Sequence, residues 1–487
     1  MLISQFDQIA LLESQMPDPL TALLLGAGAR GAEAYGPYAL ANPDQIKFVA
    51  VAEPRQERRK RFAREHTISA DLCFESWQEA LEGDQLADVV INCTQDQMHA
   101  ESSIAALQAG YDLLLEKPIA HTLEDTISIV LAAEENKRYL QICHVLRFTD
   151  FFNKVKSLLD ENRLGQVITI SHRENVSSWH MAHSFVRGNW RRQALSSPMI
   201  LAKCCHDLDL LVWFTGEAPL SLSSFGSLRH FREEKAPPGA PQRCTDGCPV
   251  EHSCPFFAPA IYIDLAPFKY ALSQAKHPLY RFVGTQGLRH PKTTQFVSKI
   301  IPQLRELTEY EGWPRSVVSD DPGNEEALWE ALRKGPYGRC VYHCDNDVVD
   351  QQVVTMEFAS GISASLTMHG HSHEEGRTLR IDGSQASLLA KFSFQRSFIE
   401  IHDHRSMEVE IFEYPNNIEQ VGHGGGDFGI LRDFIGNLQN GNKSAATARE
   451  SLESHFMAFA AEQSRLTQTQ INMAEFRKKS EAQANTS

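Results

Sequence analysis

Short apolar runs alternate with longer polar stretches over the first 145 residues, and this alternation predicts strands and helices in turn. The apolar runs lie at 22–25, 48–52, 87–94, 112–115 and 139–144. The stretches with helix-compatible patterns lie at 55–65, 99–109 and 123–136. Apolar strands separated by helices at this spacing predict a parallel, doubly wound sheet.

The pattern changes beyond residue 150. A helix is predicted over 153–162 and a strand over 167–172. Further strands joined by short turns are predicted at 353–358, 362–368, 379–381, 386–390, 398–402 and 407–414, and helices at 427–438 and 449–467. Hairpin-linked strands indicate a mostly antiparallel sheet with one covered and one open face. The predicted fold class is α/β: an N-terminal Rossmann sheet, then a C-terminal α+β domain with a large open-faced, mostly antiparallel sheet.

This organisation predicts four segments along the 487-residue chain. Residues 1–18 form an N-terminal arm that ends at two prolines, and residues 19–146 form the Rossmann nucleotide-binding domain. Residues 147–475 form the substrate and oligomerisation domain, with an insertion at about 230–340. The polar tail at 476–487 is predicted to be disordered.

A glycine pattern follows the first apolar run. Gly26 suits a tight turn, Gly28 lets a pyrophosphate approach the backbone, and Gly31 lets the next helix pack closely on the strand. Glu53 ends the second strand, where a carboxylate can bond a ribose diol and repels a 2′-phosphate. This favours NAD, whereas Arg55, two residues later, keeps NADP open as the cofactor.

Polar side chains stand at the carboxyl ends of the later strands, where ligands bind in such sheets. They are Thr94, His99, Glu116 and Lys117. The segment LLLEKPIA at 113–120 places the lysine at the mouth of a buried strand. We therefore predict that Lys117 lies at the floor of an active site.

Four motifs together support a resemblance. GAGARG at 26–31, VAEP at 51–54, INCTQDQMH at 91–99 and LLLEKPIA, in this order and spacing, resemble the Gfo/Idh/MocA family. The likeness continues through HVLRF, Gly165 and KCCHDLDLL, and covers most of residues 20 to about 470 outside the insertion. It implies a two-domain enzyme that moves hydride between a nicotinamide and a sugar or polyol C–H.

The resemblance also implies roles for single residues. Lys117 contacts cofactor and substrate hydroxyl, and His206 is the acid/base. The implied cofactor contacts are Gly26, Gly28, Arg30, Gly31, Glu53, Thr94, His99, Glu116 and Lys117.

The chain departs from the family pattern before the histidine. The family has an aspartate four residues earlier, where this chain has Ala202 followed by Lys203. Lys203 or Asp207 could replace that carboxylate, or Lys203 could bind an anionic substrate. Asp209 either orients the imidazole or serves the helix structurally.

Residues 179–192 are unusually rich in Trp, His and Arg for a predicted loop. Aromatic faces stack on sugar rings, and arginine binds hydroxyls, carboxylates or phosphates. Singly, such residues are more often structural; together they predict a substrate loop. The substrate-binding candidates are Arg147, Trp179, His180, His183, Arg187, Trp190, Lys203, Asp207 and His423. His369, His371 and His373 are interpreted as a polar strand end rather than a metal site.

A cysteine cluster lies in a Pro/Gly-rich part of the insertion. Cys244, Cys248 and Cys254 are separated by three and five residues, and Cys340 or Cys344 can supply a fourth thiol. We predict a structural zinc site on Cys244, Cys248, Cys254 and Cys340. The alternatives are an iron–sulfur cluster at the same residues, or thiols that bind nothing.

Charge and composition limit the partners. The net charge of −15, from 47 basic and 62 acidic residues, argues against nucleic-acid or anionic-membrane binding. The chain has no apolar run long enough to span a membrane and no signal-peptide pattern, so the expected location is the cytoplasm. The open sheet face predicts a homodimer or homotetramer.

The leading hypothesis is an NAD(P)-dependent oxidoreductase acting on a secondary alcohol of a sugar, polyol or sugar derivative. One alternative is an NAD-dependent glycoside hydrolase that works through a transient 3-keto sugar. The other is a nucleotide-binding regulator without catalytic activity, against which the retained Lys117 and His206 argue.

Overall fold

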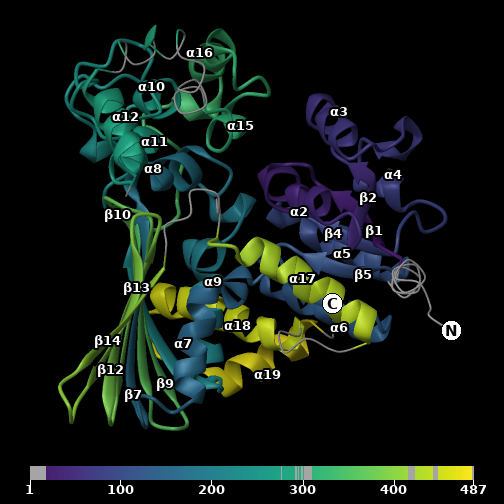
Figure 1. The fold of residues 1–487 in the computed structure, drawn as a ribbon, viewed down its shortest axis with the longest axis vertical. Coiled ribbons are helices and arrows are strands. Elements are labelled where there is room, and N and C mark those ends of the chain that lie inside the picture. The colour runs from purple at the N-terminus through teal and green to yellow at the C-terminus, as the bar shows by residue number, and fades with distance from the viewer. Residues whose placement is uncertain are drawn as a thin grey trace, which may run out of the picture.

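The computed structural model contains two sheets that lie side by side, with helices between them (Figure 1). It describes residues 18–275, 277–290, 293, 296–297, 300, 310–414, 423–441 and 448–484. Nearly all of the predicted N-terminal arm lies outside these residues.

The first sheet is parallel throughout, with the order β3-β2-β1-β4-β5-β6. This is the Rossmann order, with its switch point between β1 and β4. Its strands are β1 (Leu20–Leu25), β2 (Ile46–Ala52), β3 (Cys73–Phe74), β4 (Val89–Asn92), β5 (Asp112–Leu115) and β6 (Leu140–Ile142). The helices that follow them include α2 (Gly36–Ala41), α3 (Gln56–Glu65), α4 (Trp77–Leu81), α5 (His99–Gln108) and α6 (Leu123–Glu135). The predicted sheet is confirmed.

A helix from the far end of the chain completes this domain. Helix α17 (Gly426–Asn440) lies across the Rossmann domain (Figure 1). Its Ile430, Leu431, Phe434 and Ile435 are buried in one cluster with Leu24 of β1 and other sheet residues. The boundary drawn at residue 146 therefore omits a segment that belongs to the core of the first domain.

The second sheet has nine strands in the order β14-β13-β12-β11-β7-β10-β9-β8-β15. Only the central pair, β7 with β10, is parallel; all other neighbours are antiparallel, as predicted. The strands are β7 (Val167–Ser177), β8 (Pro219–Ser227), β9 (Gln351–Phe358), β10 (Ser363–Ser372), β11 (Gly376–Gly383), β12 (Ala386–Ser393), β13 (Ser397–Asp403), β14 (Val409–Tyr414) and β15 (Ile471–Asn472).

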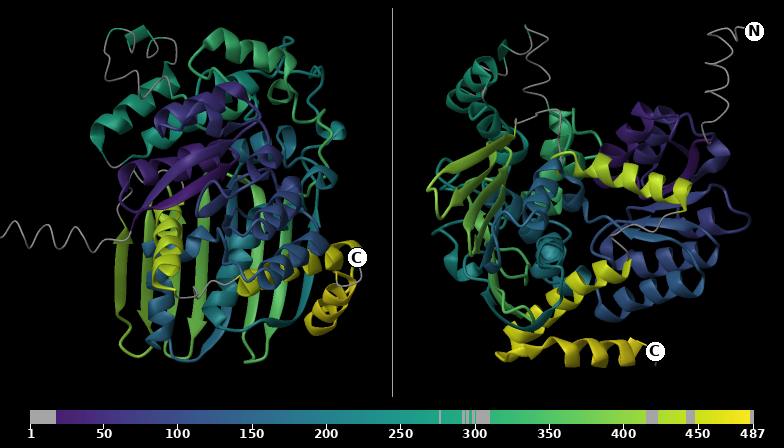
Figure 2. Two further views of the ribbon diagram at one scale, coloured as in Figure 1. Left: turned by 90° about the vertical axis from the view of Figure 1, so that its right-hand side faces the viewer. Right: turned by 60° about the horizontal axis from the view of Figure 1, so that its bottom comes forward.

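Helices cover one face of the second sheet. These are α7 (Asp150–Asp160), α9 (Met199–Thr215) and α18 (Ala448–Thr467), which lie between the sheet and the Rossmann domain (Figures 1 and 2). Several apolar side chains remain exposed on β7, β8 and β14: Ile168, Leu220, Phe225 and Ile411. The predicted open face is therefore present, and it carries apolar side chains.

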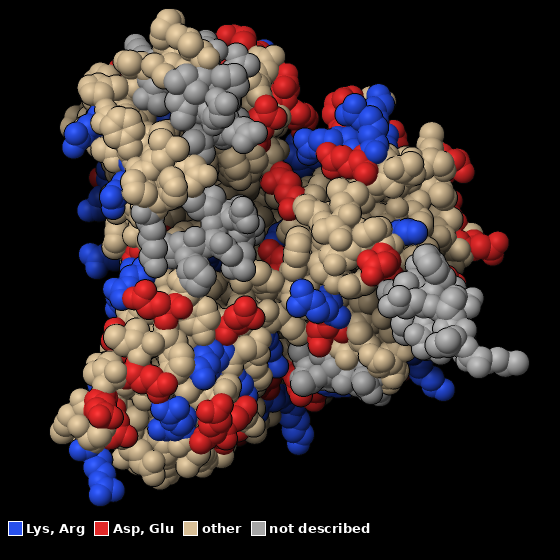
Figure 3. Space-filling model, in the orientation of Figure 1, with Lys and Arg blue, Asp and Glu red and all other residues tan. Residues whose placement is uncertain are grey.

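The insertion, residues 228–350 between β8 and β9, forms a cap. Its helices are α10 (Ala258–Tyr262), α11 (Ala266–Ser273), α12 (Pro278–Arg289), α15 (Arg315–Val318) and α16 (Glu325–Lys334). The cap reaches the Rossmann domain, where Arg55 Nη1 lies 2.9 Å from Asp320 Oδ1 and Arg58 Nη2 donates to the Ser316 carbonyl at 2.9 Å. Figure 3 shows a groove between cap and Rossmann domain, with charged side chains along its rim.

Two segments differ from their predictions. The tail is not disordered through residue 484, because α19 (Met473–Ala484) forms there; Arg477 pairs with Glu453, and the Phe476 ring contacts Phe456. The predicted substrate loop is instead helical, as α8 (Ser178–His180) and the π-helical η5 (Met181–Arg187). Its large side chains are buried, which favours regular backbone hydrogen bonding. Within the described residues, no helix is both long and apolar enough to cross a membrane.

Candidate active site

The turn after β1 has the shape of a dinucleotide cradle. Gly26 has a φ of +89°, and a Cβ there would lie 2.6 Å from the Cys93 carbonyl oxygen. A Cβ on Gly31 would lie 2.3 Å from the Gly26 carbonyl oxygen. At Gly28 only a guanidinium nitrogen of Arg58 comes within 4 Å, so the backbone is open to a pyrophosphate. The residues present therefore fit an NAD group.

Glu53 supports this turn at the end of β2. Its Oε2 accepts a hydrogen bond from Ala27 N at 2.9 Å, and its Oε1 accepts one from Arg55 N at 2.9 Å. The predicted ribose ligand thus also ties the glycine turn to the second strand. Arg55, the candidate for a 2′-phosphate, already pairs with Asp320 of the cap.

A buried charged cluster fixes the end of β5. Glu116 Oε1 accepts hydrogen bonds from Arg30 Nε at 2.6 Å and from the Tyr35 hydroxyl at 2.5 Å, and Arg30 Nη2 donates to Asp427 of α17 at 2.6 Å. Burial opposes ionisation of Glu116, but the charges of Arg30 and Lys117 and the Tyr35 hydrogen bond hold its pKa below the ordinary value. Arg30 thus fixes the side chain of Glu116, the residue that directly precedes Lys117.

Lys117, just beyond β5 of the first domain, reaches helix α9 of the second domain beside His206. Lys117 Nζ donates to the Ala202 carbonyl on α9 at 3.0 Å, and His206 lies one turn further along the same helix. His206 is 3% exposed, and neither ring nitrogen has a hydrogen-bond partner in the described structure. Burial lowers its pKa well below 6.5, and the Lys117 charge lowers it further. The imidazole is therefore neutral at pH 7 and free to accept a proton.

Two further imidazoles surround His206. Its ring centroid is 5.7 Å from that of His144 and 5.6 Å from that of His423. His423 Nδ1 lies 3.2 Å from Asp427 Oδ1, so the predicted His423 reaches the site. His144 was not predicted; its place at the carboxyl end of β6 was the available signal.

The charged residues of α9 have internal partners. Asp207 accepts hydrogen bonds from His172 Nε2 at 2.6 Å and from Arg377 Nε at 2.8 Å. Lys203 Nζ lies 2.8 Å from Glu375 Oε1 and 3.2 Å from Glu174 Oε1. Burial raises the pKa of Glu174 to about 7, although the charges of Arg377 and Lys203 act to lower it. Lys203 and Asp207 therefore anchor α9 to the sheet, and neither takes the place of the family aspartate beside His206.

Arg147 and Asp209 form a bidentate pair, with nitrogen–oxygen distances of 2.6 and 2.8 Å. Arg147 is 8% exposed. Asp209 therefore orients Arg147 rather than the His206 imidazole. Arg147, predicted to bind substrate, joins the start of the second domain to α9.

The aromatic segment at 179–190 divides into two parts. His180 Nδ1 lies 2.9 Å from Glu375 Oε1, and Trp179 packs on Trp313 of the cap. His183 is 2% exposed and hydrogen-bonds the Tyr262 hydroxyl at 2.9 Å. Arg187 is fully buried. Of this segment, His180 and Trp179 remain the substrate candidates.

Two predicted residues connect elements around the groove. Trp190 Nε1 donates to Asp96 Oδ2 at 2.9 Å, which links the second domain to the turn after β4. His99 places Nδ1 2.8 Å from the Pro118 carbonyl and Nε2 3.1 Å from the Thr94 carbonyl. His99 thereby fixes the turns after β4 and β5 relative to each other.

The predicted zinc site is not supported. Cys244, Cys248, Cys254 and Cys340 do line one pocket. Within the described residues, however, no three His, Cys, Asp or Glu side chains are arranged to hold a metal ion. The spacing of the cysteines along the sequence does not show how the fold orients their thiols. The His369–His373 segment likewise forms no such group.

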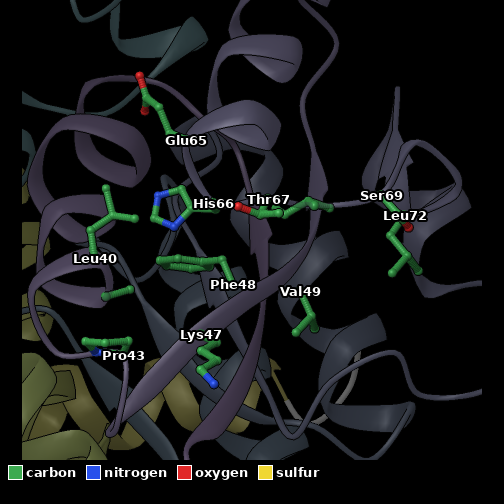
Figure 4. Close-up of a pocket in the computed structure, with 12 residues that line it drawn as sticks. Leu40, Pro43, Lys47, Phe48, Val49, Glu65, His66, Thr67, Ser69 and Leu72 are labelled. Carbon is green, nitrogen blue, oxygen red and sulfur yellow. The ribbon is translucent and has the colours of Figure 1, made fainter.

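A separate surface pocket lies away from these residues. It is formed by α2, β2 and the turn after α3, and includes Phe48, His66 and Leu72 (Figure 4). None of the predicted site residues lines it. The groove at Lys117 and His206 therefore remains the candidate active site.

We expect acid to destabilise the fold through the histidines behind this site. Burial lowers the pKa of His144 to about 4 and that of His455 to about 3. Because their unfolded pKa is near 6.5, the unfolded chain binds more protons as the pH falls below 6.5, so stability is lost there. Each should cost about 2 kcal/mol of unfolding free energy at pH 5 relative to pH 7.

Urea unfolding at the two pH values measures this loss. The loss of unfolding free energy between pH 7 and pH 5 should be about 2 kcal/mol smaller in His455→Gln than in the parent, and unchanged in the exposed-site variant His252→Gln. An unchanged pH dependence in His455→Gln would contradict the assignment.

Two family models match the chain. The model described as "Oxidoreductase family, NAD-binding Rossmann fold" matches residues 20–144. The model described as "Oxidoreductase family, C-terminal alpha/beta domain" matches residues 156–288. Together they span both domains and part of the cap.

Individual proteins show the same relationship. YteT of Bacillus subtilis (strain 168) is 22% identical over 369 residues, 72% of each chain. The 1,5-anhydro-D-fructose reductase of Ensifer adhaerens is 30% identical over 177 residues, which are 36% of this chain and only 50% of that enzyme. A levoglucosan dehydrogenase solved with NADH and levoglucosan has the same fold, with a TM-score of 0.62 and 15% identity over 94% of this chain and 100% of that one. The chain belongs to the Gfo/Idh/MocA family of NAD-binding oxidoreductases.

Proposed function

We propose that the protein is an NAD-dependent dehydrogenase acting on a secondary alcohol of a sugar, polyol or sugar derivative. The observation that carries the proposal is the buried, neutral and unpartnered His206 beside the Lys117 ammonium, which follows the carboxyl end of β5. The sugar-related substrates of the reductase and the levoglucosan dehydrogenase described above support the substrate class.

An NAD group held by the glycine turn after β1 would supply the hydride chemistry. His206 takes the proton of the substrate hydroxyl on one of its free ring nitrogens. The Lys117 ammonium stabilises the alkoxide that develops on the same oxygen. His423, held by Asp427, provides a neighbouring imidazole through which the proton can leave.

The test is the absorbance change at the NADH band over a panel of sugars, polyols, acidic sugars and glycosides, with product chromatography. Reduction of NAD by one substrate class supports the dehydrogenase. Release of free sugar from a glycoside without net NADH would instead support the glycoside-cleaving alternative. Tight NAD binding without turnover of any panel member would support the regulator.

We propose NAD rather than NADP as the preferred cofactor. Glu53 ends β2, where a carboxylate can bond a ribose diol, and Asp320 of the cap pairs with Arg55. Asp320→Ala frees Arg55 for a 2′-phosphate. It should lower the kcat/KM preference for NAD over NADP by about ten-fold, the value of one charge-assisted hydrogen bond.

Steady-state kinetics with both cofactors checks this expectation. Asp321→Ala is the matched control, because Asp321 is the adjacent carboxylate, whereas Arg55 and Arg58 both pair with Asp320. An equal change in both variants would show that the Arg55–Asp320 pair has no part in cofactor choice.

We further propose that the open sheet face pairs with a second copy of the chain. Phe225 and Ile411 are 69% and 52% exposed, and each points away from the face of its strand that packs on the helices. Exposed apolar side chains on one face favour association. Light scattering of the purified protein would identify a dimer or tetramer, and a monomer would rule the proposal out.

A further inference from the structure

One short segment of the cap lies against both of the other parts of the molecule. It consists of residues 310–320 and contains α15. Figure 1 shows α15 on the side of the cap that faces the Rossmann domain. We call this segment the strap.

The strap contacts the cofactor side of the Rossmann domain. Arg58 of α3 donates from Nη2 to the Ser316 carbonyl at 2.9 Å, and its Nε lies 3.7 Å from Asp320 Oδ1. Arg55 Nη1 lies 2.9 Å from the same carboxylate oxygen. Arg58 Nη1 is the atom that lies 3.9 Å from a Cβ built on Gly28. One guanidinium group therefore reaches from the strap to the place in the glycine turn where a pyrophosphate can approach the backbone.

The strap also contacts the helical segment that carries the substrate candidates. The ring centroid of Trp313 lies 4.9 Å from that of Trp179, 5.0 Å from that of His180 and 5.3 Å from that of His183. The strap thus touches the cofactor side and the substrate side of the molecule at once.

The middle of the strap is fixed to the rest of the cap. Arg315 is 7% exposed, and it donates from Nε to the Tyr262 carbonyl and from Nη2 to the Ile263 carbonyl, both at 2.6 Å. Charged hydrogen bonds in buried surroundings are strong, whereas ion pairs between exposed side chains are weak. The side chains of Arg55 and Asp320 are both 51% exposed. The strap therefore stays with the cap, and its contacts with the Rossmann domain are the ones that open.

We propose that the strap is a gate for the cofactor: NAD enters and leaves its site when the contacts of Arg55 and Arg58 with the strap open. These contacts join protein groups, so they slow entry and departure alike. The gate requires the NAD site of the family, but it does not depend on the proposed substrate or on the roles of Lys117 and His206. Because Trp313 belongs to the same segment, weakening its packing on the substrate side should loosen the gate as well.

Stopped-flow measurements of NADH fluorescence on the full-length protein test the gate. Mixing gives the association rate constant, and displacement of bound NADH by excess NAD gives the dissociation rate constant. Asp320→Ala should raise both rate constants about five-fold, the effect of losing exposed ion pairs with two arginines, and leave the Kd for NADH within about two-fold. Asp321→Ala, which changes the adjacent exposed carboxylate, should match the parent.

Trp313 provides a second variant, because its ring packs on the second domain and away from the two arginines. Trp313→Ala should also raise both rate constants. Trp329→Ala is its control, since Trp329 lies on α16 of the cap, where Arg333 covers its ring. If Trp313→Ala does not fold, Asp320→Ala decides alone, because the Asp320 side chain is exposed.

Parent-like rate constants in either folded variant would overturn the gate. Faster dissociation with an equally weakened Kd would also overturn it, because the strap would then act on the bound cofactor rather than on its passage. Faster exchange in both directions, together with no turnover of any sugar or polyol, would support the gate and count only against the dehydrogenase. A parent protein that binds no NADH would overturn both proposals.

Discussion

Replacing Lys117 with methionine is expected to lower kcat by about 10³-fold and to leave the affinity for NAD nearly unchanged. The Lys117 ammonium donates a hydrogen bond to the Ala202 carbonyl and lies beside the unpartnered His206. In the proposed reaction the substrate alkoxide develops at this position. Removing one donor that stabilises such an oxyanion costs about 10²–10³ in kcat. Methionine keeps the length of the side chain, so the buried strand end need not repack.

Single-turnover and steady-state rates at saturating substrate measure this loss, with NAD affinity determined separately. Lys60→Met is the control, because Lys60 is a solvent-exposed lysine of α3. A Lys117→Met enzyme within a few-fold of the parent kcat would remove Lys117 from the chemistry. A large loss of NAD affinity would assign it to cofactor binding instead.

Local sequence patterns predicted much of the fold because they reflect interactions between residues that are close together in the sequence. The buried runs and their spacing indicate a parallel sheet, and hairpin turns indicate the antiparallel one. They carry no information on which distant segments meet. Helix α17 reads as an ordinary amphipathic helix, yet it docks on the first sheet, 397 residues from its partner Arg30.

The same limit applies to the site. Lys117 and His206 could be predicted because they lie in contiguous motifs that resemble those of the family. Lys203 and Asp207 were assigned to substrate because the partners Glu375 and Arg377, more than 160 residues away, gave no local signal. Arg187 was predicted to bind substrate from its place in a Trp-, His- and Arg-rich segment, and only the fold shows that it is buried beside the cysteines of the cap.

Replacing His206 with asparagine is expected to lower kcat for alcohol oxidation by about 10²–10⁴-fold, the range for loss of a general base. Burial and the Lys117 charge hold the pKa of His206 well below 6.5. The imidazole is therefore in its basic form throughout the neutral range, and kcat/KM should stay flat as the pH falls from 8 to 6.5. The decline should begin only nearer the lowered pKa. In His206→Asn the acid decline of kcat/KM should be absent, in addition to the loss of kcat.

The coupling between the two residues gives a sharper check. Lys117→Met removes a cation that lowers the pKa of His206, so the acid limb of the residual activity should move upward toward 6.5. The same profile in His402→Gln, a histidine on β13 of the second sheet, should match the parent. An acid limb that stays in place in Lys117→Met would mean that the group titrating in kcat/KM is not the imidazole beside Lys117, and the proton would have to be assigned to His423 or His180.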